Sequence, residues 1–198
     1  MSSLRKRIDD LETDLKHEPT RISVYHDLPF AIFRYNPEDE WEMRREMKNL
    51  EIRLANSGKR VVELSLEMIL WDALQSIEER DPDDGYHALV ELEKQEGFLA
   101  AQEVLITYLS SNEWCSLAEI VANRLNALDP KRDIAFILHA AAMAPDFYQM
   151  SRLLDELHGQ TMVPAILYYP GTLEGTTGLR FMDLRNREAT GNYRVKIY

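Results

Sequence analysis

The sequence predicts a three-layer α/β fold, in which a mostly parallel sheet is flanked by helices. Two observations carry this prediction. Short apolar runs alternate along the chain with amphipathic helical segments, which is typical of right-handed βαβ units. The clearest apolar run, Asp133–Leu138, contains no polar residue after its first, as expected of a strand that is buried on both faces of a parallel sheet.

The chain begins with a predicted helix and a predicted strand. An apolar residue recurs every three or four positions from Leu4 to Leu15, which indicates an amphipathic helix, and Pro19 ends it. Phe30–Tyr35 is then expected to be a buried strand, because it is an apolar run that ends at an Asn-Pro pair.

The next helix is predicted over about 37–57 by its start and stop signals. Asn36 is expected to be its N-cap, with a proline directly after it, and Gly58 is expected to terminate it. A short strand over 61–64 follows, rich in β-branched residues. Ser65 is expected to cap the helix after that strand.

A helical insertion over about 78–128 is predicted before the strand Asp133–Leu138. Residues 81–85 are a loop by composition, and a further helix or helix pair is expected to break near Gly97. Asp129 and Pro130 end the insertion. The whole chain, 1–198, is expected to form a single α/β domain.

Beyond the strand Asp133–Leu138, the pattern predicts a helix over 146–158 and a strand over 163–169. Residues 192–198 alternate between polar and apolar side chains, which predicts a C-terminal edge strand. Because ligands of parallel sheets bind beyond the carboxyl ends of the strands, functional residues are expected in the loops after Tyr35, Leu64, Leu138 and Tyr169.

Composition limits the class of protein. The chain has 198 residues, 45% of them hydrophobic, which is a globular composition. The uncharged stretch 161–173 is too short and too polar to cross a bilayer, and the N-terminal residues lack the apolar core of a signal peptide. Cys115 is the only cysteine, so no internal disulfide can form. We therefore expect a cytoplasmic protein without a membrane segment.

The net charge of −11 is concentrated in one part of the chain. Residues 66–113 hold 12 acidic side chains and only two basic ones, Arg80 and Lys94, whereas residues 180–198 carry a balance of +3. Because affinity for nucleic acid comes mainly from Lys and Arg that neutralise phosphates, binding to nucleic acid is expected to be indirect or local. The acidic segment is either a solvated helix surface or a docking surface for a basic partner.

A glycine-rich segment over 171–180 follows a predicted buried strand. It matches neither the P-loop pattern, because no Lys follows a glycine, nor the GxGxxG pattern. Two interpretations stay open: a pair of tight turns, or a nest that binds an anion or a partner with Arg180. The candidate ligand or partner residues in this segment are Gly171, Thr172, Glu174, Gly175, Thr176, Gly178 and Arg180.

No residue pattern for catalysis is found. The five histidines and one cysteine show no zinc-site spacing, the GxSxG elbow of serine hydrolases is missing, and no phosphate loop follows the first strand. Cys115 is expected to be a packing residue, and His139 is either a structural histidine or a ligand at the end of its strand. We therefore expect no metal, no cofactor and no enzymatic activity.

Four segments resemble the BrxB family of bacteriophage exclusion (BREX) loci. They are residues 25–35, 154–158, 169–182 and 191–198. The resemblance spans essentially the whole chain, and the segment around the glycines is its most specific part. It implies a role in antiphage defence beside an adenine methyltransferase, a large ATPase and the phosphatase-superfamily protein PglZ. The family has no established catalytic residues to carry over.

The resemblance leads to two hypotheses. The first is a non-enzymatic adaptor that docks PglZ, or the BREX ATPase or methyltransferase. The second is a regulatory subunit that binds a nucleotide or nucleic acid through residues 171–180. The candidate partner surface of the first hypothesis consists of Glu78, Glu79, Asp81, Asp83, Asp84, Asn192, Tyr193, Arg194, Lys196 and Tyr198.

Overall fold

The computed structural model describes residues 4–22, 29–111, 113–114, 116–143, 147–175, 178–184 and 195–198. The helices are α1 (Leu4–Lys16), α2 (Glu40–Ala55), α3 (Leu66–Arg80), α4 (Tyr86–Glu96), α5 (Phe98–Ser110), α6 (Leu117–Asn126) and α7 (Met150–Glu156). The strands are β1 (Phe30–Tyr35), β2 (Arg60–Ser65), β3 (Asp133–Leu138), β4 (Ala165–Glu174), β5 (Gly178–Phe181) and β6 (Lys196–Ile197). Short 3-10 turns span Pro37–Asp39 and Ala140–Met143.

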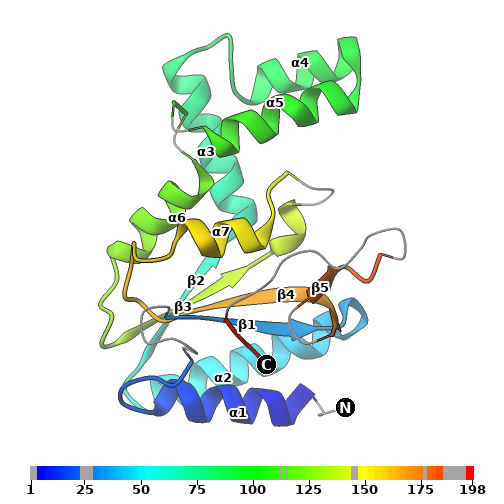
Figure 1. The fold of residues 1–198 in the computed structure, drawn as a ribbon. Coiled ribbons are helices and arrows are strands. Elements are labelled where there is room, and N and C mark those ends of the chain that lie inside the picture. Colours follow the sequence, from blue (N-terminus) through cyan, green and yellow to red (C-terminus); the bar gives the residue numbers. More distant parts are fainter. Residues whose placement is uncertain are drawn as a thin grey trace.

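The fold is the predicted three-layer α/β arrangement. Five strands lie parallel in the order β2-β3-β4-β1-β6, and β5 pairs antiparallel with the second half of β4. Helices α1 and α2 cover one face of the sheet, and α3, α6 and α7 cover the other (Figure 1). Helices α4 and α5 extend away from the sheet as a hairpin, which we call the α4–α5 arm (Figure 1).

The order of the strands reverses at the middle of the sheet, between β1 and β4, and this position is the switch point of the fold. From β1 the chain passes through α2 to the far edge strand, β2, and then returns one position at a time to β3 and β4 on the other face. The connections that leave β1 and β3 therefore lie on opposite faces and flank the carboxyl end of β4. Crevices of this kind are where open α/β sheets bind ligands.

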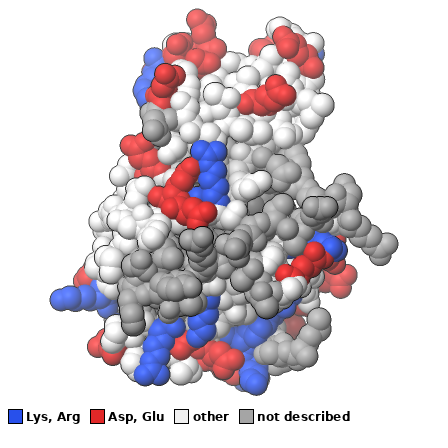
Figure 2. Space-filling model, viewed as in Figure 1, with Lys and Arg blue, Asp and Glu red and all other residues white. Residues whose placement is uncertain are grey.

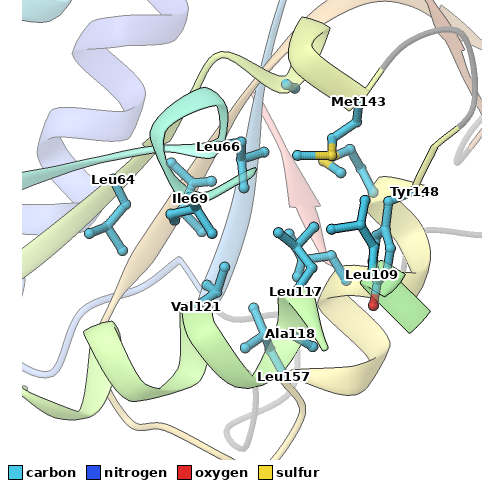
Figure 3. Close-up of a cluster of buried hydrophobic side chains, with 14 of the residues drawn as sticks. Leu64, Leu66, Ile69, Leu109, Leu117, Ala118, Val121, Met143, Tyr148 and Leu157 are labelled. Atoms are coloured by element: carbon cyan, nitrogen blue, oxygen red, sulfur yellow. The ribbon is translucent and has the colours of Figure 1, made fainter. Parts of the chain in front are cut away.

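Two apolar layers hold the sheet between its helices. Leu66 and Ile69 of α3 face Val121 of α6 in the upper layer, and Met143 and Leu157 close it (Figure 3). The lower layer packs α1 and α2 against the alternate side chains of the same strands. The apolar runs Phe30–Phe33 of β1 and Ile134–Leu138 of β3 are thus explained by burial on both faces of the sheet.

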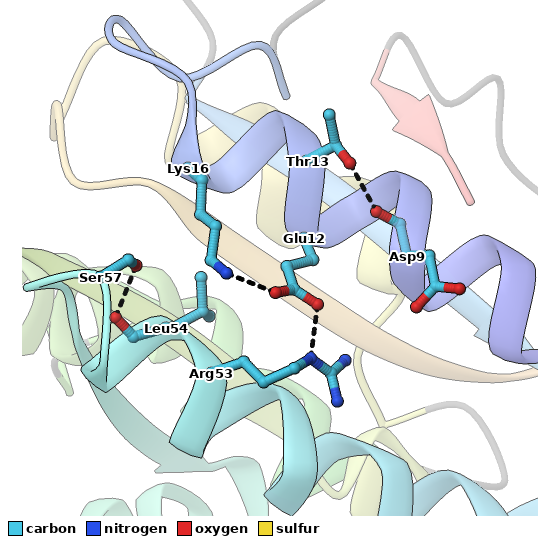
Figure 4. Close-up of polar contacts among 7 residues, drawn as sticks. All are labelled: Asp9, Glu12, Thr13, Lys16, Arg53, Leu54 and Ser57. Atoms are coloured by element: carbon cyan, nitrogen blue, oxygen red, sulfur yellow. Dashed lines mark hydrogen bonds and ion pairs between the residues drawn. The ribbon is translucent and has the colours of Figure 1, made fainter.

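A carboxylate joins α1 to α2. Glu12 accepts hydrogen bonds from Lys16 Nζ at 2.5 Å and from Arg53 Nε at 2.5 Å (Figure 4). Burial alone would raise the pKa of Glu12, but the hydrogen bonds from these two cations hold it below its usual value. The contact fixes the lower helix pair beneath the sheet.

Several local signals are confirmed by the backbone. The Ser65 hydroxyl accepts a hydrogen bond from the Met68 N–H at 3.3 Å and so caps α3. Gly58 and Gly97 have φ values of +86° and +93°, and they end α2 and separate α4 from α5. The predicted helical insertion is thus built from the end of α3, the arm and α6.

Three expected elements differ in extent from the prediction. The predicted strand over 163–169 starts at Ala165 and continues to Glu174, because Pro170 still pairs with Tyr35 of β1 and the residues from Gly171 pair with β5. The helix expected over 146–158 is described as α7, which starts only at Met150 because Gln149 has an extended backbone. The second helix begins as a 3-10 turn, and α2 proper starts at Glu40.

The C-terminal edge strand is confirmed as β6, which pairs in parallel with β1. Residues 192–194 of the expected strand lie outside the described residues. The Tyr198 N–H donates to the Ile32 carbonyl at 2.9 Å, and the Arg34 N–H donates to the Tyr198 carbonyl at 3.1 Å. The sheet thus joins elements from both ends of the sequence.

Candidate functional site

A cleft of about 270 Å³ lies between α2 and the carboxyl ends of β1 to β4. It is found where the sheet topology predicts a ligand site. Side chains from one helix and four strand ends line it. These are Tyr35, Glu40, Met43, Arg44, Met47, Lys48, Glu63, Leu138, His139 and Tyr168.

The charged groups of the cleft are arranged in pairs. Arg44 Nε donates to Glu40 at 2.6 Å, and Lys48 Nζ donates to Glu63 at 2.6 Å. Burial, together with a hydrogen bond to Glu40, raises the pKa of the Tyr35 hydroxyl and keeps it protonated. These pairs leave the walls polar but balanced in charge.

Tyr168 differs from the other polar residues of the cleft. It is only 2% exposed, and its ring packs against Phe33 and Phe136 at centroid distances of 5.5 and 5.2 Å. No hydrogen bond of its hydroxyl is found among the residues that the structure describes. Burial and the nearby Glu63 carboxylate raise its pKa, so the hydroxyl remains a donor.

His139 lies at the rim of this cleft, directly after β3. Its φ of +60° is in the left-handed region, which is uncommon for a residue other than glycine and is also adopted by Met182 and Asp183. Its Nδ1 lies 2.8 Å from the Ser65 hydroxyl, so the two strand ends are linked. Of the residues in the cleft, His139 is the one that sequence reasoning singled out as a possible ligand.

The glycine-rich segment is a β-hairpin instead of a phosphate loop. Gly171, Thr172 and Glu174 belong to β4, whereas Gly178 and Arg180 belong to β5. Gly175 lies in the turn with a φ of +64°, and Thr176 lies outside the described residues. Backbone N–H and C=O groups of these two strands are used in the ladder between them.

Close packing between β4 and β5 explains why the 171–180 hairpin has a glycine at position 171. A Cβ atom at Gly171 would lie 2.1 Å from the Arg180 carbonyl oxygen, so only glycine fits opposite β5. The Arg180 guanidinium forms an ion pair with Glu174, which lies two positions along β4 from Thr172, the register partner of Arg180. The only cation proposed for an anion nest here is therefore already paired, and binding by this segment stays a prediction.

The acidic residues predicted as a partner surface lie at the base of the arm, and three of them also stabilise it. Glu78 pairs with His87, Asp81 accepts a hydrogen bond from the Asp83 N–H at 3.1 Å, and Asp84 accepts one from the Tyr108 hydroxyl at 2.6 Å. The side chains of Glu79 and Asp83 are exposed and form no such contact with described residues. These two are the carboxylates that remain available to a partner.

The described C-terminal residues are engaged within the fold. Tyr198 is 8% exposed, and its hydroxyl donates to Asp14 at 2.6 Å. Lys196 forms an ion pair with the same carboxylate. Tyr198 is thus a core residue and not the surface residue that we expected, because the edge strand turns it under the sheet toward α1. Asn192, Tyr193 and Arg194 lie outside the described residues.

Two further features of the described residues concern metal sites and membrane-spanning helices. Within the described ranges, no group of three or more His, Cys, Asp or Glu side chains is arranged to hold a metal ion. None of the described helices is both long and apolar enough to span a bilayer.

Comparison with known proteins identifies the family. The family model described as "BREX protein BrxB" matches residues 62–197, more than half of the chain. The chain belongs to the BrxB family. It is therefore a component of a BREX antiphage system. No curated protein and no solved structure matches it significantly.

The BrxB match covers part of each candidate site. It begins in β2 and includes the arm, the 171–180 hairpin and β6, whereas α1, β1 and α2 precede it. Residues 25–35, which sequence analysis counted among the BrxB-like segments, lie outside the matched range. In the cleft, His139 and Tyr168 belong to the matched part, and the α2 wall does not.

Proposed function

We propose that this BrxB protein is a non-catalytic cytoplasmic adaptor that docks the PglZ-type protein of its BREX system. The docking surface is the α4–α5 arm with the acidic turn at its base, residues 81–84. The observation that carries the proposal is the coincidence of free carboxylates and exposed aromatic side chains where the projecting arm meets α3.

The aromatic part of this surface lies where α3 meets α4. Trp71 is 42% exposed and Tyr86 is 37% exposed, and their rings pack edge to face with centroids 4.8 Å apart. Met68, one helical turn before Trp71, is 54% exposed. Aromatic residues and Met are enriched at the centres of protein interfaces, where a polar rim surrounds them.

The charge of the arm indicates the chemistry of the partner. Figure 2 shows acidic side chains at the upper end of the molecule, over the arm, and most of the basic side chains at the opposite end. Such a separation of charge steers a basic surface toward the arm and increases the rate of association. We therefore expect the PglZ-type partner to present Lys and Arg side chains around an apolar pocket.

The test is co-purification with PglZ from cells that carry the complete BREX locus. The variant is Glu79→Lys with Asp83→Lys, because neither side chain supports the arm. The control reverses the same number of charges outside the arm, at Asp10 and Asp155, which are both exposed. We expect the arm variant to lose at least tenfold in recovered PglZ and the control to match the unmodified protein.

Other outcomes would correct the proposal. Equal recovery of PglZ by both variants would remove the arm as the docking surface. Recovery of the ATPase or the methyltransferase, but not PglZ, in an arm-dependent manner would replace the partner and keep the surface.

The alternative role, binding of a nucleotide or nucleic acid by residues 171–180, has less support. The hairpin offers no free helix N-terminus, and Arg180 is paired with Glu174. Calorimetry with ATP and with DNA, using Arg180→Ala as the variant, tests it directly.

A further inference from the structure

The docking role leaves the cleft between α2 and the strand ends without a function. We propose that this cleft binds a neutral, flat heterocyclic ligand of about the size of a nucleoside, with the Tyr168 hydroxyl as a hydrogen-bond donor to it. The inference is independent of the docking surface, because α2 covers the opposite face of the sheet from α3 (Figure 1).

The unpaired hydroxyl of Tyr168 is the first observation. The described side-chain atoms that are fully enclosed without a partner are Arg7 Nε and Arg180 Nε, so the Tyr168 hydroxyl is not sealed in the core and reaches the cleft that the residue lines. Tyr168 cannot turn away, because its ring is held between Phe33 and Phe136. Since the residue lines the cleft, a ligand acceptor there would satisfy its hydroxyl.

The charge balance of the cleft indicates a neutral ligand. Its two cations, Arg44 and Lys48, are both paired with carboxylates, at 2.6 Å in each case. A phosphate or carboxylate ligand would have to break one of these pairs, and it would meet Glu40 or Glu63 on the way. A neutral ligand with both donors and acceptors can instead donate to Glu63 and accept from Tyr168.

The apolar part of the cleft indicates a flat ring. Met43, Met47 and Leu138 line it between the polar groups, and thioethers pack favourably against aromatic rings. The volume of about 270 Å³ is close to the lower end of the range of small-molecule sites, about 300–1,000 Å³. It suits one nucleoside and is too small for a dinucleotide.

The position and the backbone of the cleft agree with this inference. The cleft lies beyond the carboxyl end of β4, between connections that leave on opposite faces. At its rim, the strained His139 is held by the Ser65 hydroxyl at 2.8 Å. Strained residues of this kind persist where the surrounding structure over-determines them, and they cluster at ligand sites.

The test is isothermal titration calorimetry of the full chain with adenosine, guanosine, cytidine and uridine as probes, and with AMP as the charged comparison. The variant Tyr168→Phe removes the hydroxyl and keeps the ring. The control is Tyr148→Phe, because Tyr148 donates its hydroxyl to Glu156 outside the cleft. We expect saturable binding of at least one nucleoside, at least tenfold weaker in Tyr168→Phe and unchanged in the control.

Three results would overturn the inference. One is the absence of saturable binding for all four nucleosides up to about 1 mM, the weakest affinity that still counts as recognition. Another is equal affinity in Tyr168→Phe. The third is tighter binding of AMP than of adenosine, which would make the site an anion site. Thermal melting of both variants accompanies the titrations. A lower melting temperature for Tyr168→Phe would reveal a hidden partner of the hydroxyl and would also refute the inference.

Discussion

The carboxylate of Asp133 and the guanidinium of Arg60 form a two-pronged ion pair between the first residues of β3 and β2. Arg60 Nε lies 2.8 Å from Oδ1 and Nη2 lies 2.5 Å from Oδ2. The same carboxylate accepts the Asp129 N–H at 2.9 Å, and Asp133 is only 1% exposed. Since Arg60 and Asp133 are also register partners, the pair fixes the alignment of the edge strand.

Removing this carboxylate is expected to destabilise the fold. Asp133→Ala leaves the part-buried Asp129 N–H and the guanidinium without their partner, at a cost of about 2–3 kcal/mol in the free energy of unfolding. Urea denaturation measures this cost. Asp155→Ala, an exposed residue on α7, is the control and should change it by less than about 0.5 kcal/mol. Equal effects of the two substitutions would contradict the role of the ion pair.

We expect the Asp133 carboxylate to make the stability of the fold depend on pH. Hydrogen bonds from Arg60 hold the pKa of Asp133 below its usual value in the folded protein. The contribution of Asp133 to the free energy of unfolding is therefore complete above its pKa in the unfolded chain, about 4. It is lost as the pH falls through the lower pKa that Asp133 has in the folded protein. We expect the stability difference between the unmodified chain and Asp133→Asn to shrink below about pH 4. A difference that stays constant with pH would refute this.

Two glycines with nearly equal φ provide a matched pair of substitutions. A Cβ at Gly85 (φ +87°) would lie 2.7 Å from Glu78 Cβ, whereas at Gly58 (φ +86°) nothing lies within 4 Å. Gly58→Ala should cost only the left-handed strain, about 1 kcal/mol. Gly85→Ala adds a clash with α3 and should cost about 3 kcal/mol. Denaturation midpoints measure both, and equal losses would show that the close approach is absent in solution.

Tyr108 is expected to fix the base of the arm. Its hydroxyl donates to Asp84 at 2.6 Å and accepts the buried Gly85 N–H at 3.3 Å. Burial, followed by the hydrogen bond to Asp84, raises the pKa of Tyr108 to about 12, so these bonds persist at neutral pH. Tyr108→Phe should lower local stability by about 1–2 kcal/mol, seen as faster amide exchange in α4 and α5.

The control for this prediction is Tyr86→Phe, since the structure gives the Tyr86 hydroxyl no hydrogen-bond partner among the described residues. Its amide exchange should match that of the unmodified chain. Faster exchange across the whole sheet in Tyr108→Phe would show that the arm does not unfold separately.

Local sequence signals predicted most of the fold, because each has a short-range cause. The apolar run of β3 follows from burial on both faces, and Ser65 and Gly97 mark helix ends through capping and positive φ. Pro170 and Gly171 misled the prediction, since both are turn residues by composition. In the structure, pairing with Tyr35 of β1 holds Pro170 extended and pairing with β5 holds Gly171, and such pairing is invisible in a local pattern.

The cleft was largely missed, because its walls come from one helix and four strand ends that are distant in the sequence. His139 was singled out from its position after a strand. Tyr168 looked like one more core residue of an apolar run, and its unpaired hydroxyl is visible only in three dimensions. The alternation of faces along β4 could have signalled it, since Ile166 and Tyr168 share the face toward α2.

The position of β1 in the sheet has a consequence for biosynthesis. β1 is one of the most apolar strands, and it leaves the ribosome before both of its neighbours, β4 and β6. Until residues 165–174 have been made, both of its edges are unpaired and its side chains cannot enter their final layers. A nascent chain in this condition is a target for chaperones and is prone to aggregate.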